Sequence, residues 1–267
     1  MNEPVNRNAE KIQYWNRVAK ESLHDNKGFS VSRHGAFLVY RQRNKSVLNL
    51  STILIDDPDR LLEEGIRLTG RGNSCQIAKV EVEGKSYVLK RYDRRGWVYS
   101  FRHVFKRSRA LRTWLAAWNL RVRGFSVADP LVCLEERRWR FLGRSYILSE
   151  YLEGRQSLTN LWSTLSDRKK QALVEQAGHL FGTLHSTGAI HGDTNWDNIL
   201  VRINGMEFDF SLVDFDCSRI LAHPDQRQAR RDINHFLRDL ARLEPTGEGL
   251  LQLFITRWQL ASNFPKT

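Results

Sequence analysis

The segment HGDTNWDNILV, at residues 191–201, constrains the fold of this chain more than any other. It places a histidine, an aspartate and, five positions after that aspartate, an asparagine directly before an apolar run. A second apolar run, FSLVDFD at residues 210–216, follows an Asn-Gly pair, which is typical of a tight β-hairpin turn. The sequence therefore predicts a hairpin whose return strand brings Asp214 back beside Asn198.

The polar residues of this hairpin indicate a metal site and a base. A carboxylate and an amide at the mouth of a hairpin offer the oxygen ligands that Mg²⁺ prefers, so Asn198 and Asp214 are the predicted metal ligands. Asp193 is then left to accept a proton from a substrate hydroxyl. Phosphoryl transfer requires this combination, because the metal neutralises charge on the phosphates while the carboxylate orients the nucleophile. We therefore predict Asp193 as a catalytic base and His191 as a structural hydrogen-bonding residue. Asp216 fits either a second metal ligand or a loop cap, and we favour the loop cap.

Candidate nucleotide-binding residues lie earlier in the chain. Lys90 ends the apolar run YVLK and is the predicted phosphate-binding cation. The turn TGRGNS contributes Gly70, Gly72 and Ser74, whose backbone N–H groups could cover phosphates, although an ordinary hairpin turn explains the same glycines. Glu150 marks the expected adenine contact, which backbone groups would make whatever side chain stands there.

The order of periodic segments predicts an α+β protein with two lobes, because strands come first and helices second. The expected N-terminal lobe covers residues 1–152, with an extension at 1–60, and the expected helical lobe covers residues 153–267. A helix is expected at 6–24, and strand-like runs are expected at 28–42 and 44–55. An antiparallel meander at 65–93, a helix at 108–123 and strands at 129–136 and 144–152 follow; the later helices are expected at 173–184, 233–240 and 248–260.

The charge of the chain indicates anionic partners. The formal net charge is +12, and no Asp or Glu occurs from Arg94 to Ala128, where nine Arg and Lys residues alternate with aromatic ones. Such a segment suits nucleic acid, a membrane surface or phosphorylated substrates, and it also suits a merely solvated face. The first residues, MNEPVNRNAEK, lack the apolar core of a secretory signal, and no apolar run reaches the roughly 20 residues that span a bilayer. With three widely separated cysteines, we expect a cytoplasmic protein with reduced thiols.

The sequence resembles the lipopolysaccharide kinase family of the protein-kinase-like superfamily, which includes the Kdo and heptose kinases of the core oligosaccharide. The resemblance covers roughly residues 65–243. The matching pieces are YVLKRY, SRALRTWLAAWNLRVRGFSVADPLV, SEYLEG, HGDTNWDNILV, LVDFD and ARRDINHFLRDL. It implies a two-lobed kinase fold, with an N-terminal antiparallel sheet plus one helix and a mainly helical C-terminal lobe. It also implies ATP with Mg²⁺, with Lys90 on the phosphates, Asp193 as base, and Asn198 and Asp214 as metal ligands.

The acceptor that the resemblance implies is a sugar hydroxyl of a lipid-linked, anionic glycan at the inner face of the cytoplasmic membrane. The basic segment 94–123 would then meet phosphates of lipid A or of the bilayer, so we expect peripheral membrane contact and no nucleic-acid partner. The sequence leaves the sugar, the hydroxyl, the role of residues 1–60 and the oligomeric state open.

One departure from kinases keeps other functions in view. The strand lysine of a kinase usually pairs with a glutamate on the following helix, but Thr113 or Trp114 stands at about that place. Glu63, Glu64 or Glu135 could orient Lys90 instead, or Asp214 could do so alone. A poorly held lysine would make the chain a pseudokinase or a basic binding scaffold. A small-molecule kinase of the aminoglycoside-phosphotransferase type, which also uses an HGD loop, is a further alternative.

Overall fold

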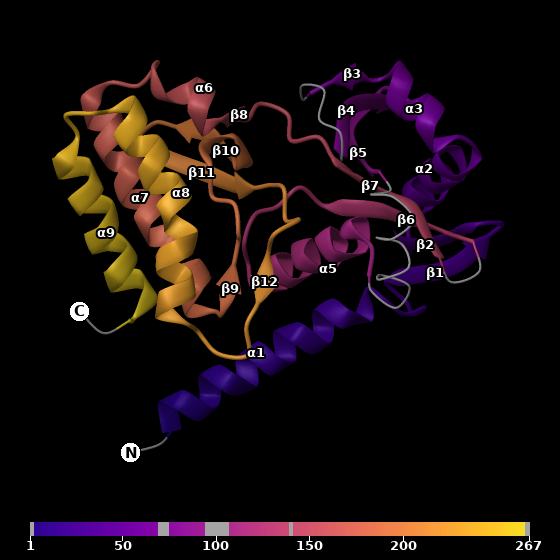
Figure 1. Cartoon of the computed structure of the whole chain (residues 1–267), viewed down its shortest axis with the longest axis horizontal. Coiled ribbons are helices and arrows are strands. Elements are labelled where there is room, and N and C mark those ends of the chain that lie inside the picture. Colours follow the sequence, from indigo (N-terminus) through magenta and orange to yellow (C-terminus); the bar gives the residue numbers. More distant parts are fainter. Residues whose placement is uncertain (1–2, 69–74, 94–106, 139–140, 265–267) are drawn as a thin grey trace. The chain divides into compact units, whose positions relative to one another are not determined.

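The computed structural model describes residues 3–68, 75–93, 107–138 and 141–264 (Figure 1). The chain forms two compact units. We call the first the sheet unit, which consists of Arg17–Asn119 and Ala128–Leu152. We call the second the helical unit, which consists of Met1–Asn16, Leu120–Val127 and Glu153–Thr267. Residues 1–16 and 120–127 thus belong to the same unit as the long C-terminal segment.

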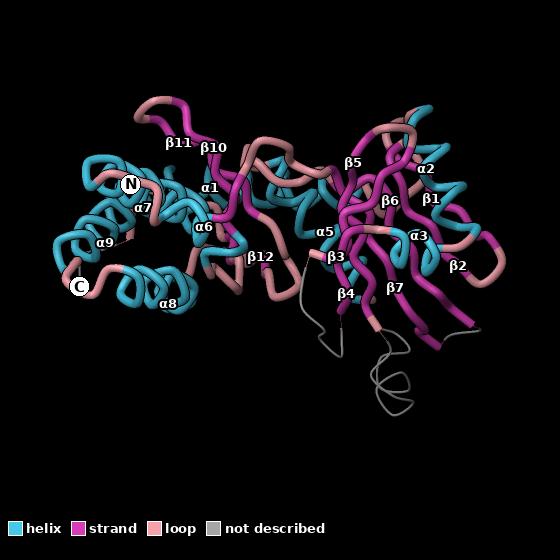
Figure 2. The backbone as a smooth tube through the Cα atoms, turned by 90° about the horizontal axis from the view of Figure 1, so that it is seen from above, coloured by secondary structure: helices cyan, strands magenta, loops and turns pink. Residues whose placement is uncertain are grey.

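The sheet unit is built on a seven-stranded antiparallel sheet, whose strands Figure 2 shows side by side. The strand order is β1-β2-β6-β7-β5-β4-β3. The strands are β1 (Phe29–His34), β2 (Phe37–Gln42), β3 (Ile66–Arg67), β4 (Cys75–Val82), β5 (Lys85–Tyr92), β6 (Pro130–Arg138) and β7 (Phe141–Glu150). The antiparallel meander expected at 65–93 and the strands expected at 28–42, 129–136 and 144–152 are therefore present.

Helices cover both faces of this sheet. Helices α2 (Lys45–Asp56) and α3 (Pro58–Glu64) share a core with strand residues such as Val39 and Leu148. Helix α5 (Arg109–Val122) contributes to a second core. This core contains Tyr40 and Ile147, which are adjacent in sequence to Val39 and Leu148. Successive residues of a strand point to opposite faces, so the two cores lie on opposite sides of the sheet.

The strand-like segment expected at 44–55 is a helix, and that expectation was wrong. Asn44 caps the helix, because its side chain accepts a hydrogen bond from the N–H of Val47 at 2.8 Å. Val47, Leu50 and Leu54 are buried at helical spacing and cover the sheet. The run is rich in β-branched residues, but packing of one apolar face against an existing sheet outweighs that weak preference.

The helical unit contains most of the remaining elements, together with a short 3₁₀ helix at Trp196–Asn198. They are the helices α6 (Leu158–Trp162), α7 (Asp167–Ser186), α8 (Gln226–Leu243) and α9 (Glu248–Ser262), and the strands β8 (Gln156–Ser157), β9 (Ala189–Ile190), β10 (Ile199–Asn204), β11 (Glu207–Leu212) and β12 (Arg219–Ile220). Helices α7 and α9 pack very closely at Gly178 and Gly182. A Cβ atom at Gly182 would lie 2.5 Å from the carbonyl oxygen of Trp258, so only glycine permits this approach.

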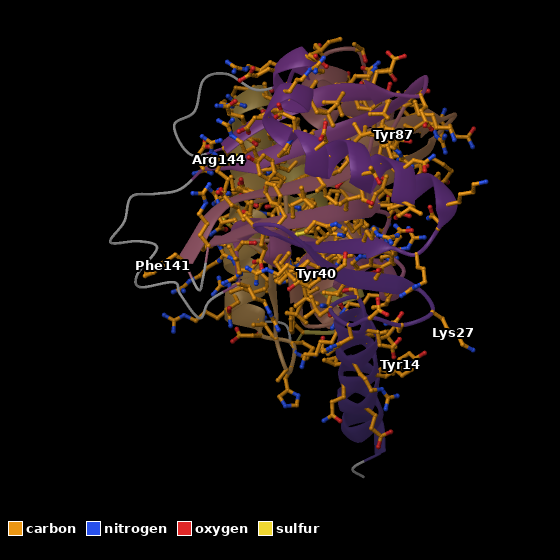
Figure 3. The ribbon with its side chains drawn as sticks, turned by 90° about the vertical axis from the view of Figure 1, so that its right-hand side faces the viewer. Tyr14, Lys27, Tyr40, Tyr87, Phe141 and Arg144 are labelled. Atoms are coloured by element: carbon orange, nitrogen blue, oxygen red, sulfur yellow. The ribbon has the colours of Figure 1, made fainter. Side chains whose placement is uncertain are left out.

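Helix α1 (Glu3–Glu21) contributes its first part to the helical unit. Ile12 is buried. The guanidinium of Arg123 lies over the ring of Trp15 and donates a hydrogen bond to the side-chain oxygen of Asn16 at 3.0 Å. Burial lowers the pKa of Arg123 to about 10. Tyr14, on the outer side of the helix, is 54% exposed (Figure 3). None of the described helices is long and apolar enough to cross a bilayer.

Candidate active site

The hairpin expected after residue 198 is present and positions the site. Strands β10 and β11 pair from Ile199↔Leu212 to Asn204↔Glu207, so the two turn residues are Gly205 and Met206 rather than the Asn-Gly pair itself. The backbone pairing continues one step further, because the N–H of Val213 donates to the carbonyl of Asn198 at 3.0 Å. Asp214 follows directly, with a positive φ of 63°. The structure thus brings Asp214 and Asn198 together at the mouth of the hairpin.

The carboxylate of Asp193 is held by three side chains. Its Oδ1 atom accepts a hydrogen bond from Nδ2 of Asn195 at 3.0 Å and lies 3.0 Å from Nδ1 of His235, a residue of α8. Its Oδ2 atom accepts a hydrogen bond from Nδ2 of Asn198 at 3.2 Å. A carboxylate oxygen can accept more than one hydrogen bond, so Oδ2 keeps capacity for a substrate hydroxyl. The side chain is 36% exposed, which leaves it accessible to an acceptor.

The side-chain amide of Asn198 is oriented by its neighbours. Its Nδ2 atom donates both to the backbone carbonyl of Asp193, at 3.0 Å, and to the Asp193 carboxylate. Because both partners are acceptors, the amide nitrogen must face them and the amide oxygen must face away. That oxygen, together with the Asp214 carboxylate, is the kind of donor set that Mg²⁺ takes when substrate phosphates and water complete its shell. No cluster of three His, Cys, Asp or Glu residues with metal-site geometry occurs among the described residues, and such a site does not need one.

His191 links the two halves of the site from the protein interior. Its Nε2 atom donates to the carbonyl of Val213 at 3.1 Å, and its Nδ1 atom accepts the N–H of Asp193 at 3.3 Å. These bonds require the neutral imidazole, and burial accordingly lowers its pKa, although nearby carboxylates oppose the shift. The ring of Phe215 packs edge-on against it, with centroids 5.4 Å apart. His191 is a structural residue, as its place in the sequence predicted.

Asp232, on α8, anchors the backbone of the HGD loop. Its Oδ2 atom accepts the N–H of His191 at 2.8 Å, and its Oδ1 atom accepts the N–H of Gly192 at 2.6 Å. Nε2 of His185 also donates to this carboxylate at 3.0 Å, because Nδ1 of the same ring accepts a hydrogen bond from Trp258 at 2.8 Å. Burial by itself raises the pKa of Asp232, but these donors and the two histidines outweigh burial and lower it.

Gly192 is required by a close approach of two loops. Its φ is 87°, and a Cβ atom there would lie 2.3 Å from the carbonyl oxygen of Cys217. The hydroxyl of Ser218 donates to the carbonyl of His191 at 2.7 Å and fixes the same approach. The loop that follows Asp214 therefore lies directly against the loop that carries Asp193.

Lys90 lies inside β5, in the sheet unit, and is buried. Its Nζ atom stands 5.1 Å from the centroid of the Tyr92 ring. The hydroxyl of Tyr92 is 3.1 Å from Oγ1 of Thr113, the residue of α5 that stands near the place of the usual glutamate. A cation over an aromatic face is attracted by the ring. Tyr92, supported by Thr113, thus contacts the lysine from the direction of the helix.

Two of the acidic residues that the sequence offered as partners of Lys90, Glu64 and Glu135, have other contacts. Glu64 accepts a hydrogen bond from Arg60 at 2.8 Å on the exposed side of α3, where Glu63 is also exposed. Glu135 is buried, but it accepts the N–H of Ser108 at 2.9 Å and pairs with Arg137 at 3.1 Å. It thereby fixes Ser108, whose hydroxyl caps α5 by accepting the N–H of Leu111 at 2.9 Å.

The remaining predicted nucleotide contacts are placed only in part. Glu150 is the last residue of β7, and its N–H donates to the carbonyl of Asp129 at 3.0 Å. Gly70, Gly72 and Ser74 lie outside the described residues, as does the first part of the basic segment, 94–106. Their predicted roles therefore stay predictions.

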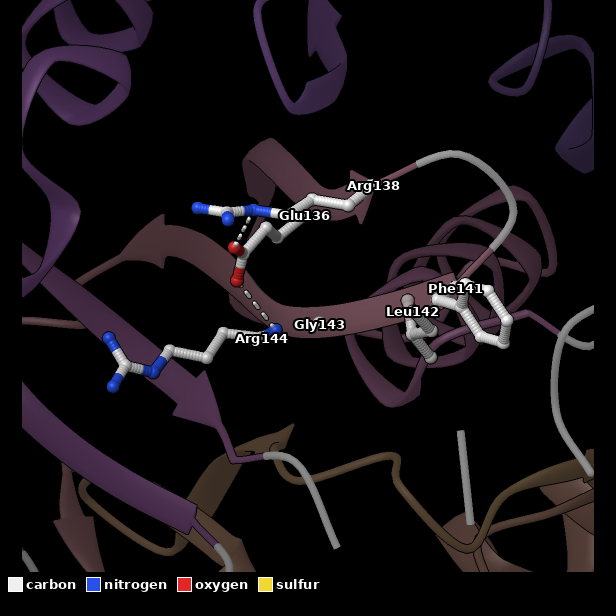
Figure 4. A pocket seen from close by; sticks show the side chains of 6 residues that line it. All are labelled: Glu136, Arg138, Phe141, Leu142, Gly143 and Arg144. Atoms are coloured by element: carbon white, nitrogen blue, oxygen red, sulfur yellow. Dashed lines mark hydrogen bonds and ion pairs between the residues drawn. The ribbon is translucent and has the colours of Figure 1, made fainter. Parts of the chain in front are cut away.

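A pocket of about 440 Å³ lies elsewhere in the sheet unit, at the β6–β7 turn (Figure 4). The side chain of Glu136 lies next to Gly143 and accepts a hydrogen bond from the N–H of Arg144 at 3.1 Å. Arg138 and Phe141 also line the pocket. None of the predicted site residues contributes to it, so it has no place in the chemistry above.

Sequence reasoning missed the three α8 residues that hold the loop: Asp232, His235 and Asp239, whose carboxylate accepts the N–H of Trp196 at 3.0 Å. Their spacing of three and four residues puts them on one side of a helix. The segment ARRDINHFLRDL contains a signal for these contacts. It places acidic and imidazole side chains at that spacing, next to the apolar residues of the buried face.

Two known proteins are similar to this chain over part of its length. The chain is 31% identical over 154 residues to the 3-deoxy-D-manno-octulosonic acid kinase of Mannheimia succiniciproducens, an alignment that covers 55% of this chain and 63% of that protein. It is 34% identical over 71 residues to the KEOPS complex subunit Bud32 of Pyrococcus abyssi, covering 26% of this chain and 32% of that protein. The chain thus spans less than two thirds of the length of each.

A solved structure shows the same fold. The structure of WaaP in complex with acyl carrier protein matches 77% of this chain and 92% of its own, with a TM-score of 0.51 at 18% identity. The expected α+β class, an antiparallel sheet followed by helices, is confirmed. The model of the lipopolysaccharide kinase (Kdo/WaaP) family matches residues 57–256, and the chain therefore belongs to this family.

Proposed function

We propose that the chain is an ATP-dependent kinase that phosphorylates a hydroxyl of a Kdo or heptose sugar in the lipopolysaccharide core. The observation that carries this proposal is the Asp193 carboxylate, held by three side chains, with the Asn198 amide oxygen and Asp214 beside it. The family membership and the relative named as a sugar-acid kinase support the same reaction class.

Each residue of the site has a distinct task in this proposal. Asp193 orients the acceptor hydroxyl through Oδ2 and takes its proton as the new bond to the γ-phosphorus forms and the bond from that phosphorus to the leaving ADP breaks. Asn198 and Asp214 hold Mg²⁺, which neutralises charge on the nucleotide phosphates when bound. Lys90 binds phosphate oxygens, and Gly70, Gly72, Ser74 and the backbone at Glu150 complete the nucleotide site. His191 keeps its proton on Nε2 and takes no part in proton transfer.

An aminoglycoside-type kinase fits less well. Aminoglycosides are cations, whereas this chain carries a net charge of +12. A pseudokinase also fits less well, because the residues proposed as base and metal ligands are all present, the Asn198 amide is oriented by Asp193, and the ring of Tyr92 contacts the lysine.

We further propose peripheral contact with the cytoplasmic face of the inner membrane. Arg107 and Arg112 are exposed at the described end of the basic segment, and exposed cations are attracted to anionic lipid. Arg109 is not counted among these exposed cations, because its guanidinium lies 4.7 Å from the centroid of the Tyr92 ring. Replacing Arg107 and Arg112 with Gln should weaken vesicle binding at low salt and leave the KM for ATP unchanged; unchanged vesicle binding would reject this contact.

The reaction is tested by ³²P transfer from labelled ATP with Mg²⁺ to lipopolysaccharide from a strain that lacks the protein. Aminoglycosides and RNA serve as parallel acceptors. We expect label in the glycolipid only, none with Asp193→Ala, and ATP binding retained in that variant. Asp214→Ala should lose both transfer and Mg²⁺-dependent ATP binding. Label in an aminoglycoside, or equal loss of ATP binding in both variants, would overturn the proposed acceptor or the proposed roles.

A further inference from the structure

Helix α8 carries a stripe of exposed arginines on one face. The burial pattern of the helix is strongly two-sided: Ala229, Ile233, Phe236 and Leu240 are buried in the core. The exposed members of the stripe are Arg227, Arg230, Arg231, Arg238 and Arg242. Their spacing of three, four and seven residues keeps them on one side of the helix. The stripe belongs to the same helix that anchors the HGD loop.

Two of these arginines flank the residue that holds the catalytic carboxylate. Arg231 and Arg238 stand four residues before and three residues after His235, so each is a direct helical neighbour of it, with Cβ atoms about 5–6 Å away. Nδ1 of His235 in turn lies 3.0 Å from Oδ1 of Asp193. Both guanidinium groups are therefore within one arginine side chain's reach of an acceptor whose hydroxyl sits at Asp193.

These two arginines have no anionic partner in the described part of the chain. No carboxylate there forms an ion pair with Arg231 or Arg238, whereas Arg242 pairs with Asp239 at 3.4 Å. Both side chains are exposed, so they contribute little to the core. Two uncompensated cations beside a carboxylate base favour the approach of an anionic ligand.

We propose that Arg231 and Arg238 bind the carboxylate of an acidic acceptor sugar and so place its hydroxyl at Asp193. This inference rests on the proposed function. A guanidinium donates two parallel hydrogen bonds to a carboxylate, which fixes orientation as well as position. The relative from Mannheimia succiniciproducens is named as the kinase of a sugar acid. The carboxylate of a sugar acid is a group that a pair of arginines can bind. The pair touches the acceptor away from the reacting atoms, so it selects the acceptor and orients it.

The test compares two acceptors and five forms of the full-length protein. The acceptors are a glycolipid that ends in the sugar acid and the same glycolipid with that carboxylate converted to its methyl ester. The proteins are wild type, Arg231→Gln, Arg238→Gln, the double variant and Arg227→Gln. Arg227 is the matched control, because it lies on the same face two turns before His235, about 12 Å along the axis. Thermal unfolding midpoints check that all five are folded.

We expect each single change to raise the KM for the acid about 10-fold and the double change about 100-fold, as for loss of charge-assisted hydrogen bonds. Arg227→Gln should change this KM less than about 2-fold, as for an exposed site away from such contacts. The ester should raise the KM of wild type and leave that of the double variant unchanged, because the two changes remove the same interaction.

Two results would overturn the inference alone. The ester could raise the KM by the same factor in wild type and in the double variant. Alternatively, the double variant could lose binding to anionic lipid vesicles while its KM for a detergent-dispersed acceptor stays unchanged, which would assign the stripe to the membrane. A wild-type protein that transfers phosphate to neither acceptor would overturn the proposed function itself, and the inference with it.

Discussion

Nδ1 of His235 lies 3.0 Å from Oδ1 of Asp193, although 42 residues separate them in the chain. Asn195 donates to the same carboxylate oxygen. The carboxylate that we propose as the base is therefore oriented from outside its own loop, by a helix whose other side is anchored in the core. This relationship leads to the first of five predictions.

His235→Ala should lower kcat about 10-fold, because the carboxylate loses a hydrogen bond that fixes its rotamer. The KM for ATP should change little, since His235 contacts the proposed base, which acts on the acceptor rather than on ATP. His235→Asn, which can still donate, should restore much of the rate. The control is His179→Ala, an exposed histidine on α7. Equal kcat values for wild type and His235→Ala would show that Asn195 and Asn198 suffice.

Asp232→Asn should lower the free energy of unfolding by about 3 kcal/mol. The buried carboxylate accepts three hydrogen bonds on its two oxygens, and an amide would turn one of those acceptors into a donor facing a donor. Urea unfolding measures this. Asp225→Asn on the same helix is the control, because asparagine caps a helix as well as aspartate does. Losses of equal size in the two variants would contradict the assigned role.

Gly192→Ala should abolish activity and destabilise the protein, because the added Cβ would collide with the Cys217 carbonyl. Gly205→Ala is the matched control. It also has a positive φ, 65°, but nothing lies within 4 Å of the added atom. The control variant should therefore lose only about 1–2 kcal/mol of unfolding free energy, which is the strain of an alanine in the left-handed region. Comparable kcat and unfolding midpoints in the two variants would show that the two loops can separate without loss.

The stability of the metal-free protein should fall as pH drops below 6.5. Burial lowers the pKa of His191 from 6.5 in the folded state, so between the ordinary and the lowered value only the unfolded chain binds the proton. Each such proton favours unfolding as pH falls. His191→Gln should flatten the fall between pH 6.5 and 5, as followed by urea unfolding in the presence of a chelator. An unchanged slope would mean that His191 takes up its proton in the folded state.

Tyr92→Leu should raise the KM for ATP about 3- to 10-fold, since a buried lysine loses the ring that it faces. Tyr92→Phe keeps the ring and loses only the hydrogen bond to Thr113, so its KM should stay within about 2-fold of wild type. Both variants are compared in steady-state kinetics at fixed acceptor concentration. Equal effects of Tyr92→Phe and Tyr92→Leu would show that the hydroxyl, which both variants lose, matters and the ring does not.

Several of these features were predictable from the sequence because the relevant contacts are local. Asp193 and Asn198 are five residues apart in one loop, and the hairpin that returns Asp214 follows from two apolar runs joined by a turn signal. The helix at 44–55 was not predictable in this way. Its apolar residues fit both the two-residue period of a strand and the 3.6-residue period of a helix, and packing against the sheet favours the helix.

The reaction class could be predicted from the sequence alone, because the residues proposed to bind metal and to accept the proton lie in two short motifs with fixed internal spacing. The contacts that hold these residues in place depend on the packing of distant elements. Asp232 and His235 reach the HGD loop across more than 40 residues, and Tyr92 rather than a helix glutamate faces Lys90. An amphipathic helix shows in its sequence which face is buried, but the partner that a polar side chain meets depends on how distant elements pack.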